Sequence, residues 1–193
     1  MKKELTRAVL QDILRHAKTP GLELVPENHQ TAVFLLIYEK NNQSHILGIL
    51  KADTPGYTWR NQVALPGGHI DPTDANPLEG ALRELSEEVG ILRDEVVCAG
   101  SLGHFQTLQR KDIEVFVGCW NGRADALCFD PGEIARILEI PLGLLIQTHM
   151  EKGFRGRVPG WEELIYPFED LPIWGVTARI FHVFLELLIP HIL

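Results

Sequence analysis

The segment from Asn76 to Ile91, NPLEGALRELSEEVGI, constrains the fold more than any other part of this sequence. Asparagine is a favoured N-cap, and Pro77 suits the first helical turn because an amide hydrogen would have no partner there. Gly90 supplies the left-handed residue that ends many helices. Between these signals, apolar residues recur at spacings of four, three and four: Leu78, Leu82, Leu85 and Val89. The segment is therefore predicted to be an amphipathic helix with one buried face.

The face opposite this apolar stripe carries a concentration of acidic side chains. Glu84, Glu87 and Glu88 fall within about one turn, where like charges weaken an isolated helix by roughly a few tenths of a kcal/mol per pair. Arg83 offsets part of this repulsion, and a bound cation would offset more. Because the cluster holds carboxylates without Cys or His, it favours Mg²⁺ or Mn²⁺ over zinc. The alternative interpretation, from the helix alone, is a solvated acidic face.

A short strand and a glycine pair precede the helix. Residues 62–65 (QVAL) have the character of a strand that Pro66 ends, and Gly67 and Gly68 follow. Paired glycines let the backbone approach a ligand closely and leave carbonyl groups accessible, so the Gly67 carbonyl is a candidate metal ligand. The order of strand, glycine turn, loop and acidic helix predicts a site for phosphate and metal.

This arrangement resembles the Nudix hydrolase family, whose signature is Gly-x5-Glu-x7-Arg-Glu-U-x-Glu-Glu-x-Gly-U, where U is a bulky aliphatic residue. Residues 83–91, RELSEEVGI, match the second half at every specified position. The first half departs from the signature. Asp74 stands where the family has Glu, six residues after Gly68, and eight residues instead of seven separate Asp74 from Arg83. The shorter acid and the insertion leave Asp74 without an assigned role.

The resemblance implies an α/β fold, an α/β/α sandwich around a mixed β-sheet, and hydrolysis of a diphosphate linkage in a small nucleotide substrate. It implies that Glu84, Glu87 and Glu88 hold one to three Mg²⁺ (or Mn²⁺) ions, with Gly67 as a further ligand. These glutamates are expected to be catalytic together with Arg83, and one of them or a loop carboxylate to deprotonate the water. Arg83 is expected to orient the glutamates by ion pairing. Some Nudix folds bind nucleotides without cleaving them, but such sensors commonly lose glutamates that this chain keeps.

Glu133 is a further candidate catalytic residue. It ends the segment Asp130-Pro131-Gly132-Glu133, which is predicted to start a short helix. In Nudix folds a carboxylate from a late loop often completes the metal site or acts as the base. The alternative interpretation is an acid that interacts with the helix dipole in a first turn.

Two runs are similar to the coenzyme A pyrophosphatase branch of the family: QVALPGGHIDPTDA and, near the C-terminus, IWGVTARI. That branch also has the extra residue before Arg83. It usually carries an Arg-Ser pair and Leu-Arg-x-His-x-Gly just before Gln-Val, residues associated with coenzyme A recognition, whereas the stretch here reads ADTPGYTWRN. Coenzyme A or its thioesters are therefore the leading expectation for the substrate, with ADP-ribose, NADH or a related compound as the alternative.

Three residues beside the glycine pair are predicted to bind substrate. Gln62 lies in the matched run, and Arg60 stands near one of the basic positions of the branch. Trp59 is either a core aromatic or a ring that stacks on a base or caps a pocket.

Composition limits the class of protein. A chain of 193 residues, 45% apolar and 23% charged, is expected to form one soluble domain over 1–193. A net charge of -8 argues against a nucleic-acid partner. Three cysteines without a close pair fit the reducing cytoplasm, where they are expected to be small, partly buried residues. The N-terminus lacks the apolar run of a signal peptide. Because Nudix proteins often dimerise, a homodimer is an open expectation.

The remaining elements are predicted from their patterns. Helices are expected at about 2–17, 141–149 and 174–189, on either side of a Nudix box at about 67–91. Arg179, His182 and Glu186 make the last of these a buried helix in preference to a membrane span. Strands are expected at 31–38, 45–50, 96–102, 113–120 and 161–166. Residues 103–112 are either a solvated hairpin tip or a substrate-contacting loop.

Overall fold

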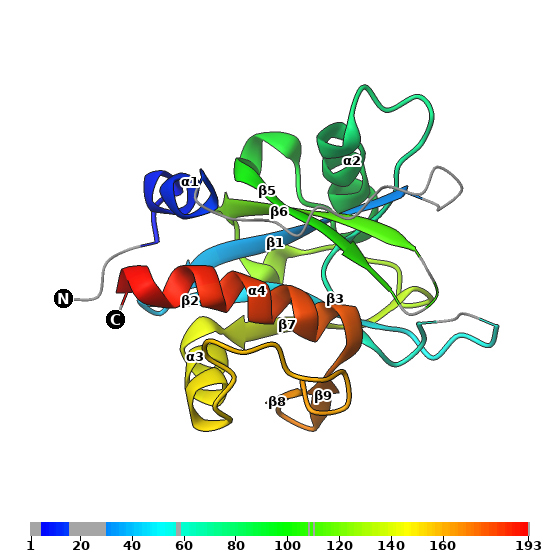
Figure 1. Cartoon of the computed structure of the whole chain (residues 1–193). Coiled ribbons are helices and arrows are strands. Elements are labelled where there is room, and N and C mark those ends of the chain that lie inside the picture. The colour runs from blue at the N-terminus through cyan, green and yellow to red at the C-terminus, as the bar shows by residue number, and fades with distance from the viewer. Residues whose placement is uncertain (1–4, 16–29, 57–58, 108, 110, 193) are drawn as a thin grey trace.

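A mixed β-sheet of seven strands forms the centre of the protein, in a computed structural model that describes residues 5–15, 30–56, 59–107, 109 and 111–192 (Figure 1). Strand β1 (Gln30–Lys40) lies antiparallel to β2 (Gln43–Lys51) and parallel to β6 (Asp112–Trp120). The order is β3 (Val63–Ala64), β2, β1, β6 and β5 (Val96–Gln106). In addition, β4 (Gly67–His69) pairs with β1, and β7 (Ile134–Pro141) pairs with β2.

The strands expected at 31–38 and 45–50 are confirmed, and they form a hairpin. Lys40 pairs with Gln43, so a two-residue turn joins β1 to β2. Asn41 and Asn42 both have positive φ, 51° and 58°, which asparagine tolerates better than most residues and which this type of turn requires.

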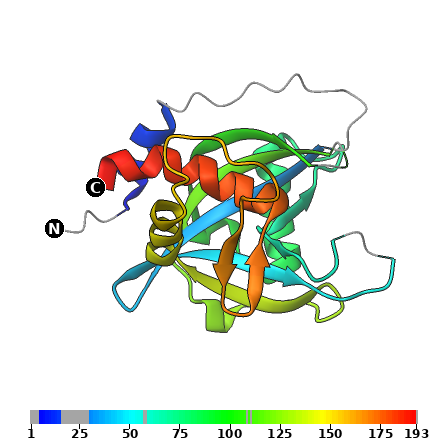
Figure 2. The ribbon, with the colours of Figure 1, turned by 60° about the horizontal axis from the view of Figure 1, so that its bottom comes forward.

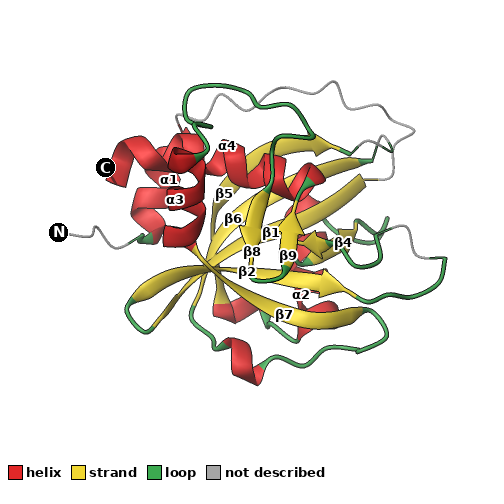
Figure 3. Ribbon diagram, turned by 90° about the horizontal axis from the view of Figure 1, so that it is seen from below, coloured by secondary structure: helices red, strands yellow, loops and turns green. Residues whose placement is uncertain are grey.

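Helices cover both faces of the sheet, because β1 is apolar on both. Alternate residues of β1 belong to two separate cores, with Val33, Leu35 and Ile37 in the first and Ala32, Phe34 and Leu36 in the second. Helices α1 (Arg7–Arg15), α3 (Leu142–Glu151) and α4 (Gly175–Ile192) pack in the first core, and α2 (Pro77–Val89) packs in the second (Figures 1 and 3). The predicted α/β/α sandwich is confirmed.

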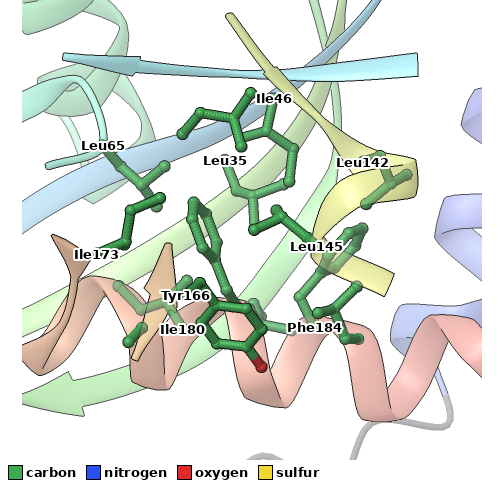
Figure 4. Close-up of a cluster of buried hydrophobic side chains, with 14 of the residues drawn as sticks. Leu35, Ile46, Leu65, Leu142, Leu145, Tyr166, Ile173, Ile180 and Phe184 are labelled. Carbon is green, nitrogen blue, oxygen red and sulfur yellow. The ribbon is translucent and has the colours of Figure 1, made fainter. Parts of the chain in front are cut away.

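The first core joins the sheet to the C-terminal part of the chain. Tyr166 lies among apolar side chains of the sheet, of α3 and of α4, including Leu35, Leu145 and Phe184 (Figure 4). Tyr166 begins a small hairpin of β8 (Tyr166–Phe168) and β9 (Leu171–Ile173), which leads directly into α4 (Figure 2). Among the described residues α4 is the one helix long and apolar enough to cross a membrane, with mean hydropathy 1.3, but half of it is buried inside the protein.

The prediction that residues 130–133 start a short helix is wrong. Asp130 instead closes a turn, where its Oδ1 accepts the Gly132 amide at 2.7 Å and its carbonyl accepts the Ile134 amide at 2.9 Å. The chain then continues as β7, which the sequence analysis missed. In β7, Ile134, Leu138 and Ile140 are buried against β2. An aspartate two residues before a glycine is common both in Asx turns and at the starts of helices. The local sequence therefore does not distinguish the two structures.

Other element boundaries also differ from expectation. The expected strand at 161–166 is a turn, with the Leu164 amide bonded to the Gly160 carbonyl at 3.0 Å, and the strand begins only at Tyr166. Strand β5 continues to Gln106, so residues 103–106 are not part of a hairpin tip. The strand expected at 62–65 is shortened to β3. Short 3₁₀ turns occur at Arg93–Glu95 and Ala124–Ala126.

The ends of two helices and the exposure of one cysteine differ from expectation. Helix α1 is described over Arg7–Arg15, and residues 2–4 and 16–17 of its expected range lie outside the described residues. Helix α4 runs to Ile192, three residues beyond the expected end. All three cysteines are free thiols; Cys98 and Cys119 are half-buried as expected, but Cys128 is exposed.

A buried polar network ties α3 to β8 and α4. His149 is fully buried, and its Nδ1 lies 2.8 Å from the Tyr166 hydroxyl while its Nε2 lies 2.8 Å from Glu186 Oε1. Glu186 Oε2 accepts the Gly156 amide at 2.8 Å. The His182 ring stands 5.2 Å from the His149 ring, and its Nδ1 is buried without a hydrogen-bond partner in the described structure.

This network predicts acid sensitivity. Burial lowers the pKa of His182 below its ordinary 6.5, and the neighbouring His149 and Arg179 lower it further, against Glu186. The unfolded chain therefore binds more protons than the native protein just below pH 6.5, so the free energy of unfolding falls as the pH drops through this region. Urea denaturation at pH 7.5 and 5.5 should show a smaller loss in His182→Leu than in the wild type. A variant of the exposed His191 in the same helix serves as control, and an unchanged loss in His182→Leu would contradict the assignment.

Candidate active site

A cavity of about 690 Å³ gathers residues from both ends of the chain, a size typical of a small-molecule site. Its wall includes acidic side chains of α2, the glycine pair of β4, the ends of β2 and β6, and the first turn of α4. Seven of the predicted site residues line it: Trp59, Gln62, Gly67, Glu84, Glu87, Glu88 and Glu133.

Helix α2 brings the three glutamates to this cavity. Asn76 is the N-cap and its side chain accepts the Glu79 amide at 3.1 Å, and Pro77 opens the helix. Gly90 ends it with φ of 74°. The apolar stripe that the sequence predicts packs in the second core, which fixes how far the opposite flank projects toward β4.

Arg83 is held at the centre of an acidic cluster. Its Nε and Nη2 donate to the two carboxylate oxygens of Asp74, each at 3.1 Å. Its Nη1 donates to Glu84 Oε1 and to Glu87 Oε2, both at 2.8 Å, and Nη2 also reaches the His69 carbonyl at 2.8 Å. The guanidinium beside Asp74 lowers the pKa of that carboxyl. Asp74 thus acquires a role that sequence left open, because it fixes the arginine that orients two glutamates.

Glu88 is the buried member of the cluster, with 8% of its surface exposed. Its Oε2 accepts the Gly67 amide at 2.9 Å, and its Oε1 accepts from the Lys51 ammonium. Burial raises the pKa of Glu88, and the charge of Lys51 is the largest effect that opposes this rise. A buried carboxylate needs such a partner, since an isolated charge loses its hydration without compensation.

The two glycines permit these close approaches. Gly67 has φ of 137°, and a Cβ there would lie 2.6 Å from Val33 Cα, inside the backbone of β1. At Gly68 a Cβ would lie 2.5 Å from Cδ of Glu84. The first glycine therefore seats β4 against β1, and the second leaves room for the Glu84 carboxylate.

The donor atoms at this site fit a hard divalent ion. In the part of the chain that the structure describes, no three His, Cys, Asp or Glu side chains are gathered into a ready ligand cage. Instead, Glu84 and Glu87 bond to Arg83, and Glu88 bonds to Lys51. Three carboxylates lie on one cavity wall, and each of them is paired with a cationic side chain. Their oxygen atoms are suitable ligands for a divalent cation, and their combined negative charge favours its binding.

Two of the predicted site residues do not line the cavity. The Arg60 side chain is exposed and its Nε lies 3.7 Å from Asp53 Oδ1. Arg83 contacts the glutamates from outside the lining. Glu133 does line it, and its backbone is fixed because its carbonyl accepts the Ala52 amide at 2.9 Å.

Sequence reasoning missed several lining residues, among them Lys51, Asp130, Val176 and Thr177, whereas Lys111 belongs to the segment for which a substrate-contacting loop was the alternative. Lys51 ends a strand and carries no local signal of a site. Thr177 reaches the cavity because its hydroxyl donates to the Val63 carbonyl at 2.9 Å, across more than one hundred residues of sequence. Only the similarity of the Trp-Gly-x-Thr-Ala segment pointed to this region.

Comparison with known proteins places the chain in a family. A model described as the NUDIX domain matches residues 28–158. A protein of Photorhabdus laumondii, named as the uncharacterized Nudix hydrolase NudL, is 30% identical over 165 residues, which cover 84% of this chain and 87% of that protein. A probable Nudix hydrolase of Schizosaccharomyces pombe is 25% identical over 187 residues, covering 95% of this chain and 65% of that protein.

Solved structures support the fold. A MutT/Nudix family protein from Enterococcus faecalis superimposes with a TM-score of 0.56, covering 97% of this chain and 76% of that chain at 13% identity. At this identity the likeness concerns the fold alone.

Proposed function

Because this chain belongs to the Nudix hydrolase family, we propose that it cleaves the diphosphate linkage of a nucleoside diphosphate derivative, with a divalent metal ion at Glu84, Glu87 and Glu88. The observation that supports the site most directly is the shared cavity: these three carboxylates and the glycine pair line a space of about 690 Å³, large enough for a nucleotide. Nudix hydrolases generally use divalent metals and act on small nucleotide substrates. We propose Mg²⁺ or Mn²⁺ as the metal, with the Gly67 carbonyl as a further ligand.

The reaction is attack of water on phosphorus. A bound metal ion supplies charge neutralisation on the phosphoryl oxygens and a lower pKa for the water. The P–O bond to the leaving phosphate breaks as the new P–O bond forms, so a diphosphate diester gives two phosphomonoesters. The protein fixes the geometry: Arg83 holds Glu84 and Glu87, and the Gly67 amide holds Glu88.

Glu133 is proposed as the residue that accepts the proton of the attacking water. Its side chain lines the cavity, and the turn that carries it is fixed by the Thr54 hydroxyl, which donates to the Gly132 carbonyl at 2.8 Å. A carboxylate on a fixed turn that lines the same cavity is suited to act as a general base. Trp59 and Gln62 line the same cavity; Gln62 is proposed to contact the substrate directly, and Trp59 to contribute to substrate binding through a neighbouring side chain. Arg60 is a substrate contact only if it leaves Asp53.

Coenzyme A or a thioester of it is the proposed substrate, on the strength of the branch-like runs around Gly67 and Thr177. The departure at residues 52–61 keeps ADP-ribose and NADH as the second candidates. With Mg²⁺ and a panel of coenzyme A, ADP-ribose, NADH and diadenosine polyphosphates, we expect two phosphomonoesters from coenzyme A at the highest kcat/KM. Phosphorus NMR and ion-exchange chromatography identify the products.

The panel also tests the alternative class of function. Tight binding of one compound with no product from any of them, with Mg²⁺ or with Mn²⁺, would show a nucleotide sensor instead of an enzyme. A boiled sample and a sample with excess chelator serve as controls for spontaneous hydrolysis.

A further inference from the structure

A lysine and a tryptophan from two different connections meet at the wall of the cavity. The ammonium of Lys111 lies 4.1 Å from the ring centroid of Trp59, within the range of a cation–π interaction. Trp59 belongs to the connection between β2 and β3, and Lys111 directly precedes β6. Both residues line the cavity together with the glutamates of α2. The contact therefore belongs to the same site, at a part of it that the reaction scheme does not use.

The backbone of Lys111 is fixed on the sheet. The Thr107 amide donates to the Lys111 carbonyl at 3.0 Å, and the Lys111 amide donates to the Thr107 hydroxyl at 3.0 Å. The next residue, Asp112, already pairs with Gln30 of β1. With its backbone anchored and its ammonium on an aromatic face, this lysine has lost part of the freedom that an exposed lysine keeps.

Lys111 differs from the other lysine of the cavity wall in its charged neighbours. The acidic residues of the lining outnumber the lysines; they are Glu84, Glu87, Glu88, Asp130 and Glu133. Of the two lining lysines, Lys51 is bonded to Glu88. Lys111 forms no ion pair with an acidic side chain among the residues described, and its charge faces an aromatic ring instead. An anion that enters the cavity thus meets a positive charge that is not bound to a carboxylate.

We propose that Lys111 binds a phosphate group of the substrate and that Trp59 is a positioning residue, which holds the ammonium at the wall before the substrate arrives. This inference deepens the proposed function, on which it rests. It assigns to Lys111 the basic role that the sequence suggested for Arg60, whose side chain pairs with Asp53. A cation–π contact suits this purpose because it orients the ammonium without neutralising it, so the charge remains available to phosphate.

The phosphate has two possible sources in a nucleoside diphosphate derivative: the scissile diphosphate itself, or a separate phosphate monoester on the ribose. Matched substrates distinguish them. Coenzyme A and NADPH carry the extra monoester, whereas 3′-dephospho-coenzyme A and NADH do not. If Lys111 contacts the diphosphate, its loss affects both members of a pair equally; if it contacts the monoester, only the phosphorylated member is affected.

The test is a set of kinetic comparisons with these substrates. We expect Lys111→Met to raise KM about tenfold, the effect of one lost charge-assisted contact, with kcat changed less than about threefold. Lys111→Arg should restore most of the affinity. Lys152→Met, which removes one exposed lysine from the end of α3, should leave both constants unchanged. Trp59→Leu should raise KM and Trp59→Phe should raise it less, because phenylalanine keeps an aromatic face.

The double variant separates positioning from a direct contact. If Trp59 acts through Lys111, Trp59→Leu combined with Lys111→Met raises KM no further than Lys111→Met alone. An unchanged KM in Lys111→Met, or fully additive effects in the double variant, overturns the proposal while leaving the hydrolase intact. If the wild type cleaves no compound of the panel, the proposed function is wrong, and KM cannot be measured. The dissociation constant of ADP, measured by calorimetry, is then compared between the wild type and the same variants.

Discussion

Replacement of Glu84 by glutamine is expected to lower turnover about 1,000-fold or more, because it removes a charged oxygen donor from the proposed metal site without changing the shape of the side chain. The amide keeps one oxygen for the bond from Arg83 Nη1. Arg83 also keeps both oxygens of Asp74, so the cluster should stay in place. Kinetics with saturating Mg²⁺, and Mn²⁺ titration by calorimetry, measure the two consequences: lost turnover and weakened metal binding.

The free energy of unfolding of Glu84→Gln should stay within about 1 kcal/mol of the wild type, since the Glu84 side chain is partly exposed. Glu79→Gln is the matched control. Glu79 lies in the first turn of the same helix, pairs with Arg93 and does not line the cavity. Wild-type turnover in Glu79→Gln with lost turnover in Glu84→Gln locates the effect in the site. Turnover above about a tenth of wild type in Glu84→Gln would remove this residue from the metal site.

Glu88→Gln should lose turnover to a similar degree but should also lose stability. Its two oxygens accept from the Lys51 ammonium and the Gly67 amide, so one of these donors would face the new NH₂ group. A buried donor left without an acceptor costs about 1–3 kcal/mol. The free energy of unfolding, measured in urea without metal, should therefore separate Glu88→Gln from Glu84→Gln. Equal stability in the two variants would contradict the observed bonding of Glu88.

The sequence was most informative where local signals agree. Helix α2 has an N-cap, a proline, an apolar stripe and a terminal glycine that all indicate the same element, and the structure begins and ends it at Pro77 and Val89. The continuous apolar run at residues 31–38 was equally reliable, because a short apolar run bounded by polar residues is typical of a strand buried on both faces. These two elements place the glutamates beside the glycine pair, and they are enough to indicate the class of site.

Other parts of the site depend on contacts that no local pattern contains. Lys51 meets Glu88 because β2 ends opposite α2, and Lys111 meets Trp59 because two separate connections converge. Asp74 departs from the signature, since a shorter acid stands with a one-residue insertion that is shared with the coenzyme A pyrophosphatase branch. Both of its carboxylate oxygens nevertheless accept from Arg83, so this departure does not disrupt the cluster.

Replacement of Gly67 by alanine is expected to destabilise the protein by about 3 kcal/mol or more. Two costs combine: φ of 137° is unfavourable for any residue with a Cβ, and that Cβ would lie 2.6 Å from Val33 Cα. Neither β4 nor the middle of β1 can yield cheaply, because both belong to the paired sheet. Gly56→Ala separates the costs, since Gly56 has φ of 85° and, beyond its two chain neighbours, nothing lies within 4 Å of the added carbon. Urea denaturation should show a loss near 1 kcal/mol there. A similar small loss in Gly67→Ala would mean that β4 does not lie as close to β1 as described.

In contrast to Gly67→Ala, Gly68→Ala should have a small effect on the free energy of unfolding and a large effect on turnover. The added Cβ would meet the carboxylate end of Glu84, with its Cδ at 2.5 Å, and a flexible side chain can rotate away where a strand cannot. The free energy of unfolding should fall by less than about 1 kcal/mol. Displacement of Glu84 by about an ångström should lower kcat about 100-fold, because a charged group acts on the reacting phosphate only from its correct position. If Gly68→Ala keeps wild-type turnover while Gly67→Ala unfolds, the role of the glycine pair is only structural. If Gly68→Ala folds and loses turnover, Gly68 is part of the site, because it leaves space for Glu84.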